Sequence, residues 1–344
     1  MGRPTVHDIA RTAEVSLATV DRVINERPGV RPATVARVQA AIADLGYVRD
    51  LGAANLARGR LYRFRFLLPA VQSQFLAGLS AAIEEAGQQL RAERCELSVL
   101  RVDLDNPITA SREMAALLDA PVDGVAIMAN ETPMVRDLIG RLDAAGTAVV
   151  SLVTDQTDAP RAHFVGIDNI AAGRTAATLM GRFLPNTPAR IAVVVNTMLA
   201  RDMVERRLGF DAVLAHDFPH LSALPSVEGH DDHAQTAQVT ATCLAANPDV
   251  TGLYCAGAGT RGVTQALSDL GLTDRLTVIG HELTAHTRTA LLDGTIDAVI
   301  TQNVGHLARS AVRVLRARCD GREIIESQEQ IRIDIVLKEN LPAH

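Results

Sequence analysis

Residues 5–25 read TVHDIARTAEVSLATVDRVIN, and this stretch decides the first fold element. Apolar side chains recur at helical spacing over residues 6–13, a turn follows, and Ser16 stands where a helix N-cap is expected. A second helical pattern occupies residues 17–25, and a third, from Pro32 to Leu45, would brace the pair. Such a unit can lay its second helix in the major groove of DNA. On pattern alone, three core-packing helices of a small cap domain fit equally well.

The same stretch, followed by AIADLGY at residues 41–47, closely resembles the head of the LacI/GalR repressor family. The resemblance runs without a gap and includes ATVDRVIN at residues 18–25. It implies base-edge contacts from Leu17, Ala18 and Arg22, and phosphate contacts from Ser16, Thr19 and Asn25. The chemistry agrees, because a guanidinium can donate two hydrogen bonds to guanine, whereas Leu and Ala can meet only apolar groups such as a thymine methyl.

Two residues depart from the family pattern. Asp21 stands where the family usually has Ser, and Glu14 replaces the common turn glycine. A carboxylate near phosphates is repulsive unless it is paired, so we expect Asp21 to pair with Arg22 or Arg11. The turn must accept the side chain of Glu14.

The connector, residues 48–61, resembles the family's hinge helix, which folds on the operator and inserts a leucine into the minor groove. Ala53 and Leu56 match the hinge positions, and a Leu wedge that unstacks a base step is a known minor-groove strategy. Gly52 would weaken this helix by about 1 kcal/mol relative to Ala. A plain flexible linker is the alternative.

Charge is unevenly distributed along the 344 residues. The net charge is −6, but residues 1–60 hold nine Arg and six Asp or Glu, so this part carries +3 and the rest −9. A basic head on an acidic body is expected where one end alone meets phosphates. The four cysteines are widely spaced, which predicts reduced thiols and no zinc site. The chain shows neither a signal-peptide pattern nor a membrane-spanning apolar run, which predicts a cytoplasmic protein without a membrane partner.

Beyond residue 62, short apolar runs alternate with amphipathic stretches of helical length. This alternation predicts an α/β fold of doubly wound parallel sheets, and the length of the segment suggests two sheets. The segment resembles the family's two-lobed regulatory domain, which is similar to periplasmic sugar-binding proteins (type I). The expected domains are the head at 1–47, the hinge at 48–61 and the effector domain at 62–344. Within the last, the N-lobe would hold 62–165 and 304–330, and the C-lobe 166–303 and 331–344.

Ligands of such folds bind outside the carboxyl ends of the strands, where polar side chains would converge on hydroxyl groups. Matching the family positions, the predicted effector-binding residues are Ser73, Phe75, Asn130, Asp168, Arg206, Glu282 and Gln302. For each carboxylate, a helix N-cap or a surface ion pair is the alternative. A carbohydrate is the expected effector, while a nucleoside, an amino acid derivative or a phosphorylated metabolite stays open.

Two features complicate the site. The chain reads AGAGT at residues 256–260, where the family commonly shows Asn-Asp, and Glu282 replaces a common Asp. Residues 229–233 read GHDDH, which could suggest a metal site, but a helix cap and solvated surface are the expected reading.

Enzymes and transport receptors share this type of sheet. The sequence has no Walker loop, no dinucleotide-binding glycine motif and no recognisable catalytic triad, and the head argues against a receptor. We therefore predict a non-enzymatic regulator without cofactor or metal. It would be a homodimer that binds pseudo-palindromic double-stranded operator DNA.

Overall fold

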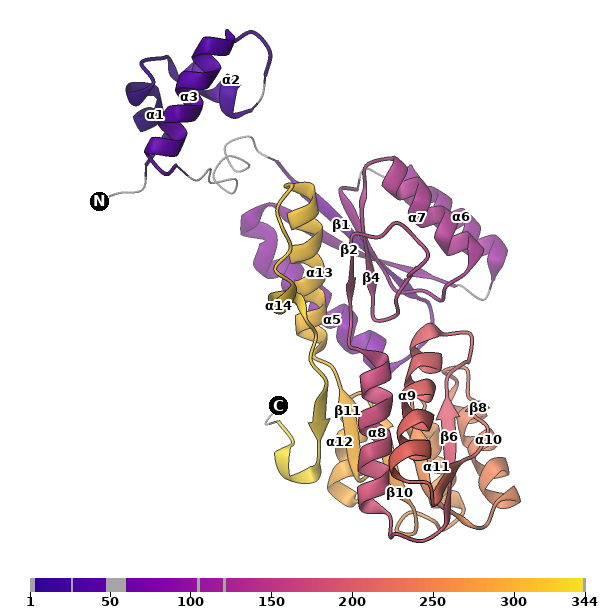
Figure 1. Ribbon diagram of the computed structural model, residues 1–344. Coiled ribbons are helices and arrows are strands. Elements are labelled where there is room, and N and C mark those ends of the chain that lie inside the picture. The colour runs from indigo at the N-terminus through magenta and orange to yellow at the C-terminus, as the bar shows by residue number, and fades with distance from the viewer. Residues whose placement is uncertain (1–3, 26, 48–59, 104–105, 120–121, 343–344) are drawn as a thin grey trace. The chain divides into compact units, whose positions relative to one another are not determined.

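The computed structural model describes residues 4–25, 27–47, 60–103, 106–119 and 122–342 (Figure 1). The chain divides into two compact units, residues 1–60 and residues 61–344. Within the described ranges, no helix combines the length and apolar character needed to cross a membrane.

The first unit is a three-helix head made of α1 (Val6–Thr12), α2 (Leu17–Ile24) and α3 (Pro32–Asp44). Ser16 is the N-cap of α2, and its hydroxyl accepts a hydrogen bond from the Thr19 backbone N–H at 3.2 Å. This confirms the cap that the sequence predicts.

The core of the head is small and apolar. Ile9, Val20 and Val38, one from each helix, are fully buried against one another. Between α1 and α2, Glu14 adopts a left-handed conformation with φ of 51°, so the turn does accept a side chain where the family has glycine. The tight turn and the shared core hold α2 with its polar side outward.

The second unit contains two lobes, each built on a wholly or mainly parallel sheet. The sheet of the first lobe has the order β2-β1-β3-β4-β5. Its strands are β1 (Tyr62–Pro69), β2 (Cys95–Val102), β3 (Gly124–Ile127), β4 (Ala148–Leu152) and β5 (His163–Val165). Its helices are α5 (Gln74–Leu90), α6 (Pro107–Leu118), α7 (Pro133–Ala144) and α13 (Val304–Cys319), with a 3-10 turn at Arg91–Glu93.

Helices cover both faces of this first sheet. Helices α5 and α13 pack together on one face, and α6 and α7 pack on the other (Figure 1). Alternate residues of β1 serve the two layers: Phe66 packs in the core beneath α5 and α13, and its neighbour Leu67 packs in the core beneath α6 and α7.

The sheet of the second lobe has the order β12-β11-β10-β9-β6-β7, and β8 pairs with β6. Its strands are β6 (Ala189–Val195), β7 (Leu221–Ala223), β8 (Val227–Glu228), β9 (Val250–Cys255), β10 (Thr277–His281), β11 (Ala298–Thr301) and β12 (Asp334–Val336). Its helices are α8 (Asn169–Phe183), α9 (Arg201–Asp217), α10 (His233–Ala246), α11 (Thr260–Asp269) and α12 (Ala285–Asp293). A short helix, α14 (Glu326–Glu329), and a 3-10 turn at Lys338–Asn340 complete the unit.

The two doubly wound sheets confirm the predicted fold class, with one correction. Strand β12 pairs with β11 in the antiparallel sense, whereas the sequence predicts parallel sheets throughout. The chain leaves this sheet after β11 to form α13 on the first lobe, and it returns to the same end of the sheet to form β12. A strand that re-enters from the end at which its neighbour left must run the opposite way.

Helices α8 and α9 pack closely because each has a glycine that faces the backbone of the other helix. A Cβ added at Gly173 would lie 1.9 Å from the Arg206 carbonyl oxygen, and one at Gly209 would lie 2.1 Å from the Ile170 carbonyl oxygen. Only hydrogen fits at these positions, so the spacing of the two helices depends on both glycines.

Gly173→Ala should lower the free energy of unfolding by about 1–3 kcal/mol, because the added methyl must push α9 away from α8. The measurement is urea denaturation of the full chain. Gly140→Ala, in α7, is the control: nothing lies within 4 Å of its added Cβ, so this change should leave stability unchanged or raise it by up to about 1 kcal/mol. Equal stabilities of the two variants would contradict the close-contact account.

Candidate DNA-binding head and effector cleft

The outward side of α2 carries the predicted base-reading residues. Leu17 is 42% exposed, and Ala18 and Arg22 are exposed beside it. The Arg22 side chain makes no hydrogen bond or ion pair within the described residues, so its guanidinium is available to a base edge.

The predicted phosphate-contacting residues lie at the two ends of α2. Ser16 Oγ and Thr19 Oγ1 are 2.9 Å apart at its start. Asn25 caps its end, where its side-chain N–H donates to the Asp21 carbonyl oxygen and to the Asp21 carboxylate, each at 2.7 Å. The predicted hinge residues Ala53 and Leu56 lie outside the described residues.

The prediction that Asp21 pairs with Arg22 or Arg11 is wrong. Its carboxylate lies 3.4 Å from Arg27 Nη1, while Arg11 pairs with Asp8 at 2.8 Å. Arg22 points away because successive helix positions lie about 100° apart, whereas the chain after α2 turns back toward Asp21. The carboxylate is therefore partly neutralised, which reduces its repulsion of a phosphate.

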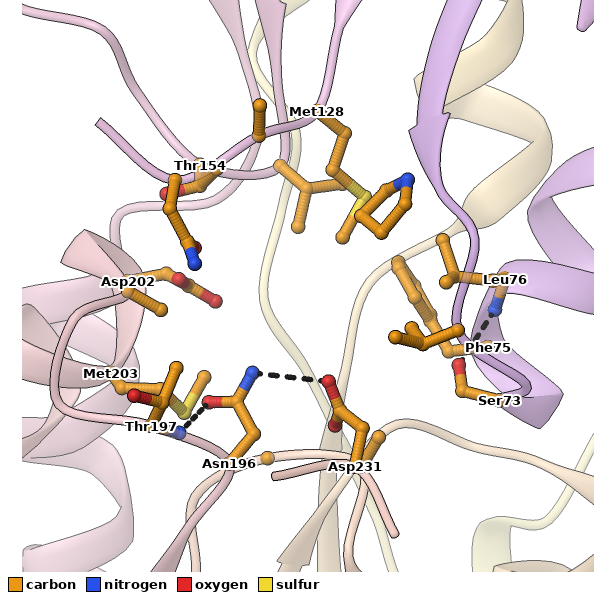
Figure 2. Close-up of a pocket in the computed structure, with 18 of the residues that line it drawn as sticks. Ser73, Phe75, Leu76, Met128, Thr154, Asn196, Thr197, Asp202, Met203 and Asp231 are labelled. Atoms are coloured by element: carbon orange, nitrogen blue, oxygen red, sulfur yellow. Dashed lines mark hydrogen bonds between the residues drawn. The ribbon is translucent and has the colours of Figure 1, made fainter. Parts of the chain in front are cut away.

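In the second unit, a cavity of about 420 Å³ lies between the two lobes. Figure 2 shows Ser73, Phe75 and Leu76 of the first lobe on one side, and Asn196, Asp202 and Asp231 of the second lobe opposite them. Five predicted effector-binding residues line this cavity: Ser73, Phe75, Asn130, Arg206 and Glu282. The residues come from the loops after strands and from the first two turns of helices, where ligands of doubly wound folds bind.

Arg206 is the central cation of the cleft, and only 2% of it is exposed. Its Nε donates to the Asn169 side-chain oxygen at 2.9 Å, and its Nη1 donates to the Ala256 carbonyl oxygen at 2.7 Å. Its Nη2 faces Glu282 Oε1 at 3.8 Å. These contacts hold the guanidinium rigidly at the cleft wall and compensate its charge.

Two buried carboxylates share this wall. Burial raises the pKa of Glu282 to about 7, although Arg206 and a 2.9 Å hydrogen bond from Gln302 Nε2 favour its charged form. Burial also raises the pKa of Asp202, against the attraction of Arg206. The cleft therefore offers strong hydrogen-bond acceptors in a partly desolvated place.

Backbone strain gathers at the same cavity. Val153, His230, Asp231 and Glu282 all have φ between 51° and 67°, in the left-handed region that non-glycine residues rarely adopt, and all four line the cleft. For a β-branched residue such as Val153, this conformation is a true outlier. Strained residues cluster at binding and catalytic sites, which supports a functional role for this cavity.

The structure places two predicted effector-binding residues outside the cavity wall. Asp168 is the N-cap of α8, accepts a 2.9 Å hydrogen bond from the Ala171 N–H, and lines a separate surface depression. The alternative of a helix cap therefore describes Asp168 better. Gln302 is buried behind Glu282 and positions that carboxylate without lining the cavity.

Sequence reasoning missed several polar residues of the cleft, among them Asn196, Asp202 and Asp231. Asn196 directly follows the predicted strand at 191–195, and Asp202 precedes Arg206 by one helical turn, so position and spacing could have identified both. Asp231 belongs to the GHDDH stretch: Asp232 caps α10 as expected, but His230 and Asp231 line the cleft instead of solvated surface alone. Among the described residues, no group of His, Cys, Asp and Glu could hold a metal ion.

The two units match two known families. Residues 5–50 match "Bacterial regulatory proteins, lacI family", and residues 64–323 match "Periplasmic binding protein domain". The chain belongs to the LacI family. It is thus a DNA-binding transcription regulator with an effector domain of the periplasmic-binding-protein type.

Relatives of this LacI-family chain are also regulators. It is 28% identical over 255 residues to the maltose regulon regulatory protein MalI of Escherichia coli. This match covers 73% of this chain and 71% of MalI. It is 38% identical over 81 residues to the catabolite control protein A of Priestia megaterium, a match that spans 24% of each protein.

Solved structures share the fold of the second unit. The glucose-galactose binding protein GanP of Geobacillus stearothermophilus matches with a TM-score of 0.74 and 20% identity, over 83% of this chain and 100% of GanP. A LacI-type regulator structure from Bacteroides fragilis matches with a TM-score of 0.71 and 18% identity, over 82% of this chain and 98% of that one.

Arg22→Ala should weaken binding to a preferred operator fragment by about 10- to 100-fold, because a bidentate base contact contributes about 1–3 kcal/mol. Fluorescence anisotropy at fixed salt measures this loss. Arg37→Ala, an exposed change on α3, removes the same charge and should weaken preferred and random duplex about equally. If Arg22→Ala likewise weakened both duplexes equally, Arg22 would not read bases.

Glu282 should make stability depend on pH. Its pKa rises from an unfolded value near 4.5 to about 7, so the folded state retains the proton longer and the free energy of unfolding falls as pH rises from about 4.5 to 7. Glu282→Gln cannot ionise and should remove this decline. The variant should gain about 2–3 kcal/mol relative to wild type between pH 5 and pH 8.

Urea denaturation at the two pH values measures this difference. Glu84→Gln, at an exposed position of α5, is the control for loss of a carboxylate. Parallel pH dependence of wild type and Glu282→Gln would contradict the assignment of a raised pKa.

Proposed function

We propose that this regulator is a repressor whose affinity for its operator is controlled by a sugar or sugar derivative bound between the lobes of the second unit. The observation that carries this proposal is the interlobe cavity, in which buried Arg206 and Glu282 lie among strained residues and polar loop residues. Because the same chain carries a DNA-reading helix, ligand binding in that cavity can control the affinity of the protein for DNA.

The chemistry of the cavity favours a polyhydroxylated ligand. Carboxylates of Asp202 and Glu282 accept hydrogen bonds from hydroxyl groups, and the amide of Asn130 can both donate and accept. Phe75 and Leu76 supply an apolar surface for the carbon face of a ring. The fold is shared with GanP, which is described as a glucose-galactose binding protein, and this supports the same class of ligand.

The ligand would act by favouring one arrangement of the lobes. Contacts across the cleft already exist: Arg201 Nη1 lies 3.3 Å from Glu131 Oε2 and donates to Thr157 Oγ1 at 2.9 Å, and the His286 N–H donates to the Gln74 side chain at 3.3 Å. A ligand touching both lobes binds the closed arrangement more tightly and shifts the equilibrium toward it.

The signal would reach DNA through a homodimer. Two chains would pair through their effector domains, chiefly the N-lobes, and present two heads to the half-sites of a pseudo-palindrome. In this scheme the hinge at 48–61 would place Ala53 and Leu56 in the minor groove between the half-sites.

The test uses the full-length protein with palindromic fragments from its own upstream region. We expect salt-sensitive binding that exceeds binding to random duplex, and a change of at least about tenfold on adding one member of a panel of sugars and sugar derivatives. Asn130→Ala, at the half-buried cleft wall, should keep operator binding and blunt the response.

Leu292→Ala, at an exposed position of α12, is the control and should keep both properties. If the protein bound no palindromic fragment more tightly than random duplex, the proposal that it recognises an operator would be wrong. If Asn130→Ala kept the full change of operator binding on adding the sugar, the effector would bind outside this cavity.

A further inference from the structure

A second, smaller cavity of about 120 Å³ adjoins the cleft in the second unit. The two cavities share Ser73, Phe75, Asp231, Ala258 and Glu282 in their walls. A ligand in the cleft could therefore extend one group into the smaller space without leaving its main site.

Four helices begin at the smaller cavity. Its wall includes the first residues or N-caps of α5, α10, α11 and α12. The N-terminus of a helix carries a partial positive charge and free N–H groups, so four of them together favour an anion.

Helix α11 is the one whose start is open. Its N-cap is Gly259, which offers no side-chain cap, whereas Ser73, Asp232 and Thr284 cap the other three helices. The approach is glycine-rich, since AGAGTRG at residues 256–262 links β9 to α11. A Cβ on Gly262 would lie 2.6 Å from the His233 carbonyl oxygen, so this glycine lets the starts of α10 and α11 lie side by side.

Basic side chains line the same space. Arg261, His233 and His286 are in its wall, and none of them forms an ion pair with a carboxylate in the described part of the chain. His286 Nε2 lies 2.8 Å from Thr264 Oγ1, and an anion that accepts from this nitrogen would have to replace that contact. Burial, with Arg261 and His233, lowers the pKa of His286, while Asp293 opposes this shift. An anion bound in this space would favour the protonated form of His286, which its surroundings disfavour in the free protein.

A buried histidine adds an independent observation. His281 is 1% exposed and lines this cavity, and its Nδ1 has no hydrogen-bond partner among the described residues. Its Nε2 lies 2.9 Å from the Tyr254 hydroxyl. When that hydroxyl donates to Nε2, the proton of the neutral imidazole is on Nδ1, which then needs an acceptor.

The carboxylates in the wall form hydrogen bonds with residues outside the small cavity. Asp232 caps α10 through a 2.7 Å hydrogen bond from the Gln235 N–H, and Asp231 accepts from Asn196 at 3.4 Å. Glu282 accepts from Gln302 and faces Arg206. Each is directed to a partner outside the small cavity, which leaves its N–H groups and basic side chains to an incoming ligand.

We propose that this cavity is an oxyanion subsite that receives the phosphate monoester end of the effector, with the rest of the ligand in the larger cleft. Arg261 and His286 would donate to the phosphate together with the first-turn N–H groups of α11 and His281 Nδ1. The subsite narrows the ligand class from sugars to sugar phosphates, and in that respect it rests on the proposed function.

Inorganic phosphate is the first probe, titrated into the full-length protein by calorimetry in a non-phosphate buffer. We expect saturable binding that Arg261→Gln and His286→Gln each weaken about tenfold or more, because each removes a hydrogen bond to a charged group. Arg275→Gln, an exposed arginine of the same lobe outside both cavities, is the control and should leave the affinity unchanged. Absence of saturable binding, or equal binding by all variants, overturns the subsite.

The second arm separates a phosphate carried by the effector from a free ion. Pairs of sugars and their phosphate monoesters compete with inorganic phosphate, and we expect one ester to displace it at lower concentration than its parent sugar. Displacement by parent sugars alone, or by no ester, overturns the assignment to the effector.

Operator binding by Arg275→Gln, measured without ligand, should match wild type. Failure of the wild-type protein to bind an operator would instead count against the proposed function, so the two failures are distinguishable.

Discussion

The effector domain is organised around one buried positive charge. A guanidinium that is 98% removed from water must recover its lost hydration from fixed partners, and Arg206 does so with Asn169, the Ala256 carbonyl and Glu282. These partners come from the start of α8, the loop after β9 and the end of β10. Their convergence requires the α8–α9 contact that Gly173 and Gly209 permit, so helix packing and the chemistry of the cleft are a single constraint.

The same constraint also explains why residues of the cleft lower the stability of the folded domain. Glu282 is charged only against the penalty of burial, and it adopts a left-handed backbone conformation together with Val153, His230 and Asp231. A folded chain retains such strain only where the surrounding packing enforces it. A ligand that satisfies the buried acceptors and touches both lobes would recover part of this energy. It is this recovery that could bias one lobe arrangement over another and make the domain a switch.

Local rules predicted much of the molecule from the sequence. The Ser16 cap, a turn that accepts the Glu14 side chain and the outward Arg22 each depend on residues within one or two turns of helix, and the structure has all three. Two residues have partners other than those predicted from the sequence. Asp21 pairs with Arg27 beyond the end of α2, and Asp168 caps α8 because its own helix N-terminus is nearer than any ligand site.

The sequence by itself determined the fold class of both units, because helix caps, apolar periodicity and the alternation of strand and helix are local properties that a single stretch of chain contains. The resemblance of residues 5–47 to a known repressor family indicated the class of protein. It also placed Ser73, Phe75, Asn130, Arg206 and Glu282 near strand ends, where cleft residues belong. Only the tertiary structure decided which polar side chains face one another: Asp202 and Asp231 join the cleft, while Gln302 stands behind Glu282. It likewise brought together four helix N-termini from separate parts of the chain. The physical reason is that charge, burial and backbone strain depend on distances between segments far apart in sequence, and packing alone sets those distances.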